Sequence, residues 1–201
     1  MIYIVLNSCV LINLLFIANK FKNFPTLLKN LLEKENAKIF IPTITVDKEI
    51  IYKNQRDILQ NMIRENIIEL VKVKKEEIEN IRLLYSHRLG LGEKAMFILV
   101  KRSLENNKFS IGFTNDKLAM KKMESDIPLL HGLWFYTQMF VYGIVNDKIE
   151  LEKIINEANK DMKMEIKDLE NIKEEYLNKK SSLEEIITNF KKVHENENKT
   201  I

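Results

Sequence analysis

Short apolar runs alternate with longer segments of helical periodicity along the first two-thirds of the chain. Runs of this length that end at polar or turn-forming residues are typical of buried strands. They predict strands at Ile2–Leu6, Lys38–Ile41, Phe109–Phe113 and Ile127–Leu130. A further segment, Ile67–Val73, alternates weakly, which is typical of either a strand or the end of a helix.

Helical patterns occupy the stretches between these runs, with apolar residues at three- and four-residue spacing. They predict helices at Val10–Ala18, Pro25–Leu32, Arg56–Glu65, Glu76–Tyr85, Lys117–Met123 and Leu133–Tyr142. Thr43 is placed to cap one more helix, which carries Glu49 in its second turn and continues into the segment from Arg56. Strands and helices that alternate in this way predict an α/β fold, with a parallel sheet covered by helices on both faces.

A long apolar run follows two glycines in the stretch 90–101. Gly90 and Gly92 let the backbone turn sharply, and the run after them is too continuously apolar for a surface helix. We therefore expect a helix buried against the sheet. Glu93 stands where the turn becomes the run. Its carboxylate either pairs with the helix dipole, an interaction worth about 0.3–1 kcal/mol, or helps to hold a metal ion.

The last part of the chain is highly charged and contains neither glycine nor proline beyond residue 143. Apolar residues recur every seven positions from Ile155 to Phe190, and Ser182 with Glu185 forms a capping-box pattern. The pattern predicts helices at about 147–178 and 183–194. We expect a domain at 1–145 and a charged helical extension at 146–201, which either packs on the same chain or forms a homodimer or partner interface.

The amino-acid composition excludes several classes of protein and of binding site. The 201 residues are 45% hydrophobic, enough for a substantial core, and the 30% that are charged sum to a net charge of only +3. Any affinity for nucleic acid must therefore come from a local patch. The single cysteine, Cys9, excludes an internal disulfide and a multi-cysteine zinc site, and we expect it to be a small core residue. The apolar N-terminus lacks a basic start and is interrupted by polar residues, so we expect no signal peptide, no membrane span and a cytoplasmic protein.

Four polar positions share one predicted place in the fold. Asn7 ends the first strand, Glu49 lies in the helix after the second, Glu93 begins the central helix, and Asp116 follows the strand Phe109–Phe113. Because strand ends and the following helix starts lie on one edge of a parallel sheet, we expect these side chains to face a common pocket. Two carboxylates 4 Å apart repel by roughly 4 kcal/mol at an effective dielectric near 20. A divalent cation such as Mg²⁺ or Mn²⁺, which prefers oxygen ligands, would relieve that repulsion.

The motifs around these positions resemble those of PIN domains in order and spacing. They lie at residues 4–8, 41–49, 89–95 and 114–119, and they include the Gly-Glu motif before an apolar helix and the sequence Thr-Asn-Asp. The resemblance covers about residues 2–145. It implies a Rossmann-like sheet and a Mg²⁺- or Mn²⁺-dependent nuclease that cleaves single-stranded RNA, often the toxin of a toxin–antitoxin pair. It places the catalytic and metal-binding roles on Asn7, Glu49, Glu93 and Asp116, with Ser8, Thr114 and Asn115 in support.

The chain departs from the PIN pattern at three positions. Asn7 stands where the family has its first aspartate, Asn115 replaces the first residue of the usual Asp-Asp pair, and Met120 replaces a common arginine. An amide oxygen can coordinate a metal but brings no charge, so we expect weaker metal binding and slow or absent cleavage. Asn7 is either natural, marking a degenerate member, or an introduced change that disarms a nuclease.

Other polar residues are candidates for contacts with RNA. Lys94, Lys117 and Lys121 either form a basic rim that holds a phosphate backbone or belong to solvated helix faces. His131 is either a structural histidine or lies at the edge of the pocket. The alternative to a nuclease is a catalytically silent PIN-like module that binds RNA or protein, with the helical tail as its interaction element. An antitoxin or another protein partner is expected under the first hypothesis.

Overall fold

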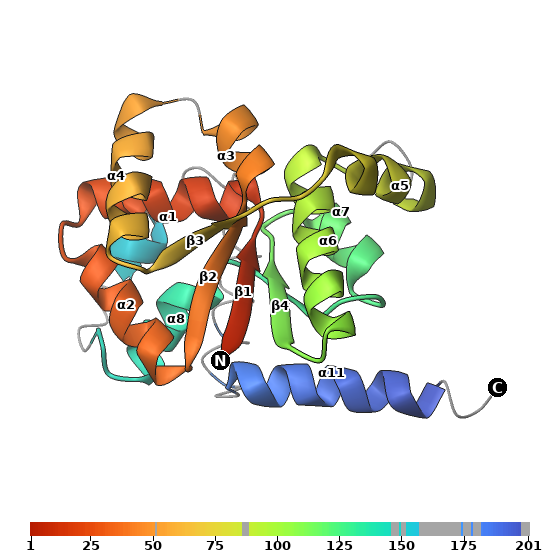
Figure 1. Ribbon diagram of the computed structural model, residues 1–201. Helices are drawn as coiled ribbons and strands as arrows, with labels where there is room; N and C mark the ends of the chain where they lie inside the picture. The colour runs from red at the N-terminus through yellow and green to blue at the C-terminus, as the bar shows by residue number, and fades with distance from the viewer. Residues whose placement is uncertain are drawn as a thin grey trace.

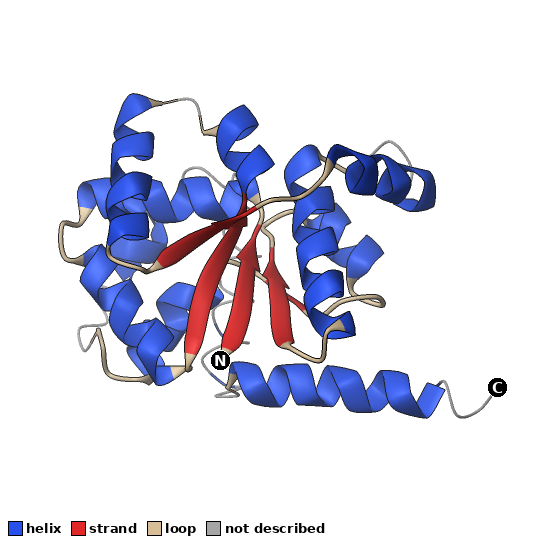
Figure 2. Cartoon of the chain, viewed as in Figure 1, coloured by secondary structure: helices blue, strands red, loops and turns tan. Residues whose placement is uncertain are grey.

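A computed structural model of the chain describes residues 1–50, 52–85, 89–145, 149, 152–156, 174, 178 and 182–197, without the side chains of 82–85, 140 and 194–197. Its centre is a sheet of five parallel strands in the order β3-β2-β1-β4-β5 (Figure 2). The strands are β1 Ile2–Leu6, β2 Ala37–Pro42, β3 Ile68–Val71, β4 Phe109–Phe113 and β5 Leu129–Leu130. The predicted α/β fold with a parallel sheet is confirmed, and the ambiguous segment 67–73 contains a strand.

The fifth strand is shorter than the predicted Ile127–Leu130. The amide of Ile127 donates to the carbonyl of Met123 at 3.0 Å, in the turn that closes the preceding helix. Pro128 has no amide hydrogen, although its carbonyl accepts from Gly112 at 3.0 Å. Regular pairing with β4 therefore begins only at Leu129.

Helices cover both faces of the sheet (Figure 1). They are α1 Ser8–Lys20, α2 Phe24–Lys34, α3 Thr43–Glu49, α4 Lys53–Arg64, α5 Lys75–Tyr85, α6 Leu91–Glu105, α7 Lys117–Met123, α8 Trp134–Val141 and α11 Leu183–Glu197. Helices α1, α2, α4 and α8 share one core with Ile4 of β1, and α5, α6 and α7 share a second core with Val5. Neighbouring residues of a strand point to opposite faces, so β1 contributes to both layers.

The predicted central helix is buried as expected. Every residue of α6 from Gly92 to Val100 is buried, because the helix lies against β1 and β4 and is covered on its other sides by α3 and α5. A helix with neighbours all round has no face left for polar residues, which explains the long apolar run.

The segment after β2 differs from the prediction. Thr43 is the first residue of α3 and Pro42 occupies the N-cap position, and Glu49 is the last residue of this short helix rather than an early one. The helix does not continue into α4, because Ile50 leaves the helical conformation (φ −91°, ψ 88°) with its side chain fully buried. The Arg56 side chain then donates to the carbonyl of Ile50 at 2.7 Å, which holds the break in place.

The last helix, α11, crosses beneath the starting ends of the strands (Figure 1). The predicted capping box is confirmed: the Ser182 amide donates to Glu185 Oε2 at 3.0 Å and the Glu185 amide to Ser182 Oγ at 3.3 Å. The buried carboxylate of Glu35 accepts from the Leu183 amide at 2.9 Å and from the Tyr142 hydroxyl, which ties α11 to α2. Most of the predicted helix 147–178 lies outside the described residues.

Among the described helices, none has both the length and the apolar character needed to cross a membrane.

Candidate functional site

The carboxyl ends of the two central strands meet at one edge of the sheet. Asn7 follows β1 and Thr114 follows β4, and the Asn7 amide donates to the carbonyl of Phe113 at 3.1 Å. Helices α1 and α7 begin directly after these strands, and α6 begins beside them at Leu91. The edge therefore gathers strand ends and helix starts, the place where open α/β sheets bind ligands.

The Asn7 side chain is the centre of a buried hydrogen-bond network. Its Nδ2 donates to Glu93 Oε1 at 3.0 Å and to Thr114 Oγ1 at 2.8 Å. Its Oδ1 accepts from the Val10 amide at 3.1 Å and thereby caps α1, and it also accepts from Cys9 Sγ at 2.9 Å. The amide oxygen is thus held toward the helix and the amide hydrogens toward the carboxylate.

The two glycines at the start of α6 make room for the acidic side chains: Gly90 is its N-cap residue and Gly92 lies in its first turn. A Cβ on Gly92 would lie 2.9 Å from Ser8 Oγ, 3.2 Å from the Ser8 amide and 3.4 Å from Glu49 Oε1. A Cβ on Gly90 would overlap the carboxylate of Glu93. The first turn of α6 is therefore in contact with Ser8 from α1 and Glu49 from α3, so the predicted residues converge across three helices.

The carboxylates of the site interact electrostatically. Burial raises the pKa of Glu93 above its usual value, and repulsion from Asp116 and Glu49 raises it further. The hydrogen bond from Asn7 opposes this shift because it stabilises the ionised form. The carboxylates of Glu49 on α3 and Asp116 on the β4–α7 connection are thus close enough to Glu93 on α6 to affect its ionisation.

Asp116 has a structural task at the same edge. Its Oδ1 accepts from the amides of Leu118 at 2.7 Å and Ala119 at 3.1 Å, so it caps α7. Its own amide donates to Thr114 Oγ1 at 3.1 Å. The fully buried Thr114 hydroxyl therefore connects Asn7 with the backbone of Asp116. Asp116 itself is exposed, so its carboxylate lies at the mouth of the site.

Compared with known proteins, the chain matches no protein-family model, no curated protein and no solved structure.

Cys9 packs against the core, as expected, and its sulfur also takes part in the hydrogen bonds of the site. It is half-buried, donates to Asn7 and accepts from the Asn115 amide at 3.3 Å, and burial raises its pKa. Asn115 Oδ1 accepts from the Gly132 amide at 3.0 Å, so this residue joins the end of β4 to the turn after β5. The only sequence signal for Cys9 was its position two residues after Asn7, where the first turn of α1 folds back on the strand end.

The predicted basic residues separate into two groups. Lys94 is only 8% exposed and does not belong to a solvent-facing basic rim, since α6 is covered on all sides at this position. Lys117 and Lys121 are exposed on α7, next to Asp116. His131 is buried and its Nδ1 accepts from the Leu133 amide at 3.2 Å. Burial and the nearby charge of Lys117 lower its pKa to about 4, so this structural histidine is neutral at physiological pH.

The donor set suits a hard cation only in part. Glu49, Glu93 and Asp116 supply carboxylate oxygens, the ligands that Mg²⁺ and Mn²⁺ prefer. Within the described ranges, however, no three His, Cys, Asp or Glu side chains are grouped closely enough to hold a metal ion. Asn7 presents N–H groups rather than an oxygen to Glu93, and this hydrogen bond partly compensates the negative charge.

Proposed function

We propose that this chain is a PIN-type endoribonuclease, dependent on Mg²⁺ or Mn²⁺ and attenuated by Asn7. The observation that carries the proposal is the convergence of Asn7, Glu93 and Thr114 in one hydrogen-bond network, within electrostatic range of Glu49 and Asp116. Glu93 is the buried acid among them, and a buried carboxylate beside other acids lowers stability, a cost that is found most often at functional sites.

The carboxylates of Glu49, Glu93 and Asp116 would hold the cation. Such an ion, when bound, activates water and stabilises the charge that develops on a phosphodiester under attack. Burial and the neighbouring acids raise the pKa of Glu93, so a cation held there would also reduce the cost of keeping this carboxylate ionised. The exposed Lys117 and Lys121 would hold the phosphate backbone of a single-stranded RNA beside the site.

Asn7 explains why the activity is attenuated. An aspartate here could cap α1 with one oxygen, as Asn7 does with Oδ1, and present its second oxygen to a cation. The asparagine instead presents Nδ2, which donates to Glu93 and Thr114 and offers neither charge nor a lone pair. The site thus keeps its shape and loses one negatively charged ligand.

The test is cleavage of an unstructured single-stranded RNA in the presence of Mn²⁺. We expect Asn7→Asp to cleave at least ten times faster than the unaltered chain, and Asn7→Asp combined with Glu93→Gln to lose the gain. If the Asn7→Asp variant is folded but cleaves the RNA as slowly as the unaltered chain does, the proposed catalytic site is wrong.

One observation favours a second candidate, a PIN-like binding module without catalysis. The hydrogen bond from Asn7 to Glu93 stabilises the carboxylate, so Glu93 has a partner without a bound metal ion. Under this alternative the unaltered chain binds RNA or a protein partner, and Mn²⁺ changes neither its stability nor its binding. An antitoxin and a cytoplasmic location are proposed together with the first candidate, and a homodimer, formed through the helical tail, is proposed under either candidate.

A further inference from the structure

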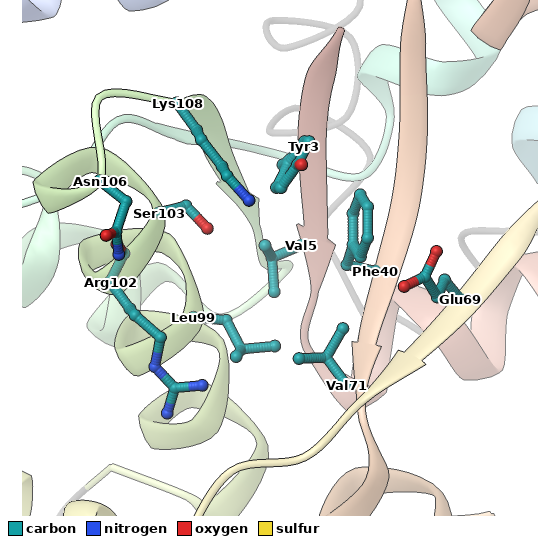
Figure 3. Close-up of a pocket in the computed structure, with 10 residues that line it drawn as sticks. All are labelled: Tyr3, Val5, Phe40, Glu69, Val71, Leu99, Arg102, Ser103, Asn106 and Lys108. Atoms are coloured by element: carbon teal, nitrogen blue, oxygen red, sulfur yellow. The ribbon is translucent and has the colours of Figure 1, made fainter.

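A hollow lies between α6 and the strands β1, β2 and β3, away from the candidate nuclease site (Figure 3). Its volume is about 250 Å³. Tyr3 lines it near the start of β1, whereas Asn7 follows the end of the same strand. Four residues of strand separate these positions by roughly 13 Å. The hollow is therefore separate from the site around Asn7.

The floor of the hollow is aromatic. The rings of Tyr3 and Phe40 lie side by side on adjacent strands, with centroids 4.4 Å apart and an interplanar angle of 30°. Val5, Val71 and Leu99 complete an apolar surface around them. Aromatic rings on the surface of a sheet are suited to stacking against a planar ring of a ligand.

The two ends of the hollow carry opposite charges. At the α6 end, Lys108 extends its ammonium over the Tyr3 ring, 4.7 Å from the centroid, and no carboxylate in the described part of the chain forms an ion pair with it (Figure 3). Arg102 also lines this end, but it is paired with Glu77. At the β3 end stands the carboxylate of Glu69, half-exposed and 2.7 Å from Lys38.

These features define the chemistry of a ligand. It has a planar ring for the aromatic floor, an anionic group at the end with Lys108, and a hydrogen-bond donor at the end with Glu69. The volume lies just below the range of pockets for drug-sized ligands, about 300–1,000 Å³, which limits the ligand to a small molecule or to one unit of a larger one.

We propose that this hollow binds a single nucleotide, whose base displaces the Lys108 ammonium from the face of the Tyr3 ring and whose phosphate is held by the displaced, exposed Lys108. An exocyclic amino group of the base would donate to Glu69, as cytosine does to carboxylates in nucleic-acid complexes. The nucleotide is either a free nucleoside monophosphate or one unit of a single-stranded RNA. The inference does not depend on the proposed nuclease activity, because it uses none of the residues of that site.

The experiment measures binding of adenosine 5′-monophosphate to the full chain by isothermal titration calorimetry. Lys108→Gln removes the exposed cation and leaves the fold intact, and Lys29→Gln, an exposed lysine on α2, is the matched control. We expect Lys108→Gln to raise the Kd about tenfold, the loss of one charge-assisted contact, and Lys29→Gln to leave it unchanged. Tyr3→Leu should weaken binding of adenosine as well as of the nucleotide.

Further probes identify the source of the nucleotide. Adenosine alone and inorganic phosphate alone should each bind more weakly than the nucleotide. If a single-stranded RNA binds more tightly than adenosine 5′-monophosphate, and Lys108→Gln weakens both equally, the site binds an RNA strand. If the RNA and the nucleotide bind with equal affinity, the site binds the free nucleotide. The proposal is overturned if neither adenosine 5′-monophosphate nor the single-stranded RNA binds at 10 mM. It is also overturned if the Lys108→Gln variant binds the nucleotide and the RNA as tightly as the unaltered chain does.

Discussion

At the scale of single residues, the orientation of one amide decides the character of the candidate site. Two donors, the Val10 amide and Cys9 Sγ, fix the Asn7 oxygen, and the opposite side of the amide then donates to Glu93. Reversing the amide would bring its oxygen against a carboxylate and its nitrogen against a backbone N–H. The geometry therefore follows from hydrogen-bond chemistry alone.

The raised pKa of Glu93 predicts how stability depends on pH. A carboxyl whose pKa is higher in the folded state binds more protons there than in the unfolded chain, so it lowers stability as the pH rises above its unfolded value near 4.5. Glu93→Gln removes this ionisation and keeps an oxygen for Asn7. We expect the variant to be about 1 kcal/mol more stable at pH 8, a typical size for one substitution.

Chemical denaturation between pH 4 and pH 8 checks this prediction. The advantage of Glu93→Gln should shrink toward the acidic end, where the carboxyl of the unaltered chain is protonated in both states. If Glu93→Gln and the unaltered chain are equally stable across the whole pH range, ionisation of Glu93 does not lower the stability of the folded state, and the prediction is wrong.

At the scale of elements, the site depends on how closely three helices approach one another. The first turn of α6 meets Ser8 at the start of α1 and Glu49 at the end of α3, and only glycine at position 92 permits this approach. The sequence pattern located the glycines and the acids correctly. It could not show that α3 ends at Glu49, because that end depends on the burial of Ile50 in the core.

Gly92→Ala tests this packing. Its new methyl group would lie 3.2 Å from the Ser8 amide, which belongs to the backbone and cannot move aside. We expect a net loss of about 1–2 kcal/mol, because overpacking outweighs the higher helix propensity of alanine. Thermal unfolding of the variant measures the loss. A variant as stable as the unaltered chain would mean that α1 and α6 are less tightly packed than described.

At the scale of the whole molecule, the strand and helix order follows from the hydrophobic pattern, and the details of the tail do not. The alternation of apolar runs and helical segments predicted the parallel sheet, and the capping box predicted the start of α11. Nothing in the pattern indicated that Glu35, 148 residues earlier, would accept from the Leu183 amide. Such long-range partners depend on the assembled fold, as do the burial of Lys94 and the bonding of Cys9.

The whole molecule also carries two separate candidate sites with different chemistry. The edge with Asn7 carries the carboxylate of Glu93, with those of Glu49 and Asp116 within electrostatic range of it, and the hollow lined by Tyr3, Phe40 and Lys108 carries aromatic rings and an exposed cation. Because the two sites share no residues, the proposed nuclease activity and the proposed nucleotide binding can be tested, and refuted, independently of each other.

The most direct test of the central claim is the effect of Mn²⁺ on the thermal stability of Asn7→Asp. Without metal, the new carboxylate faces Glu93, and we expect the variant to be less stable than the unaltered chain. Mn²⁺ at 100 times its Kd should restore about 2.7 kcal/mol and leave the unaltered chain little changed. A variant that is no less stable without metal, and indifferent to Mn²⁺, would contradict the claim that these acids share a cation site.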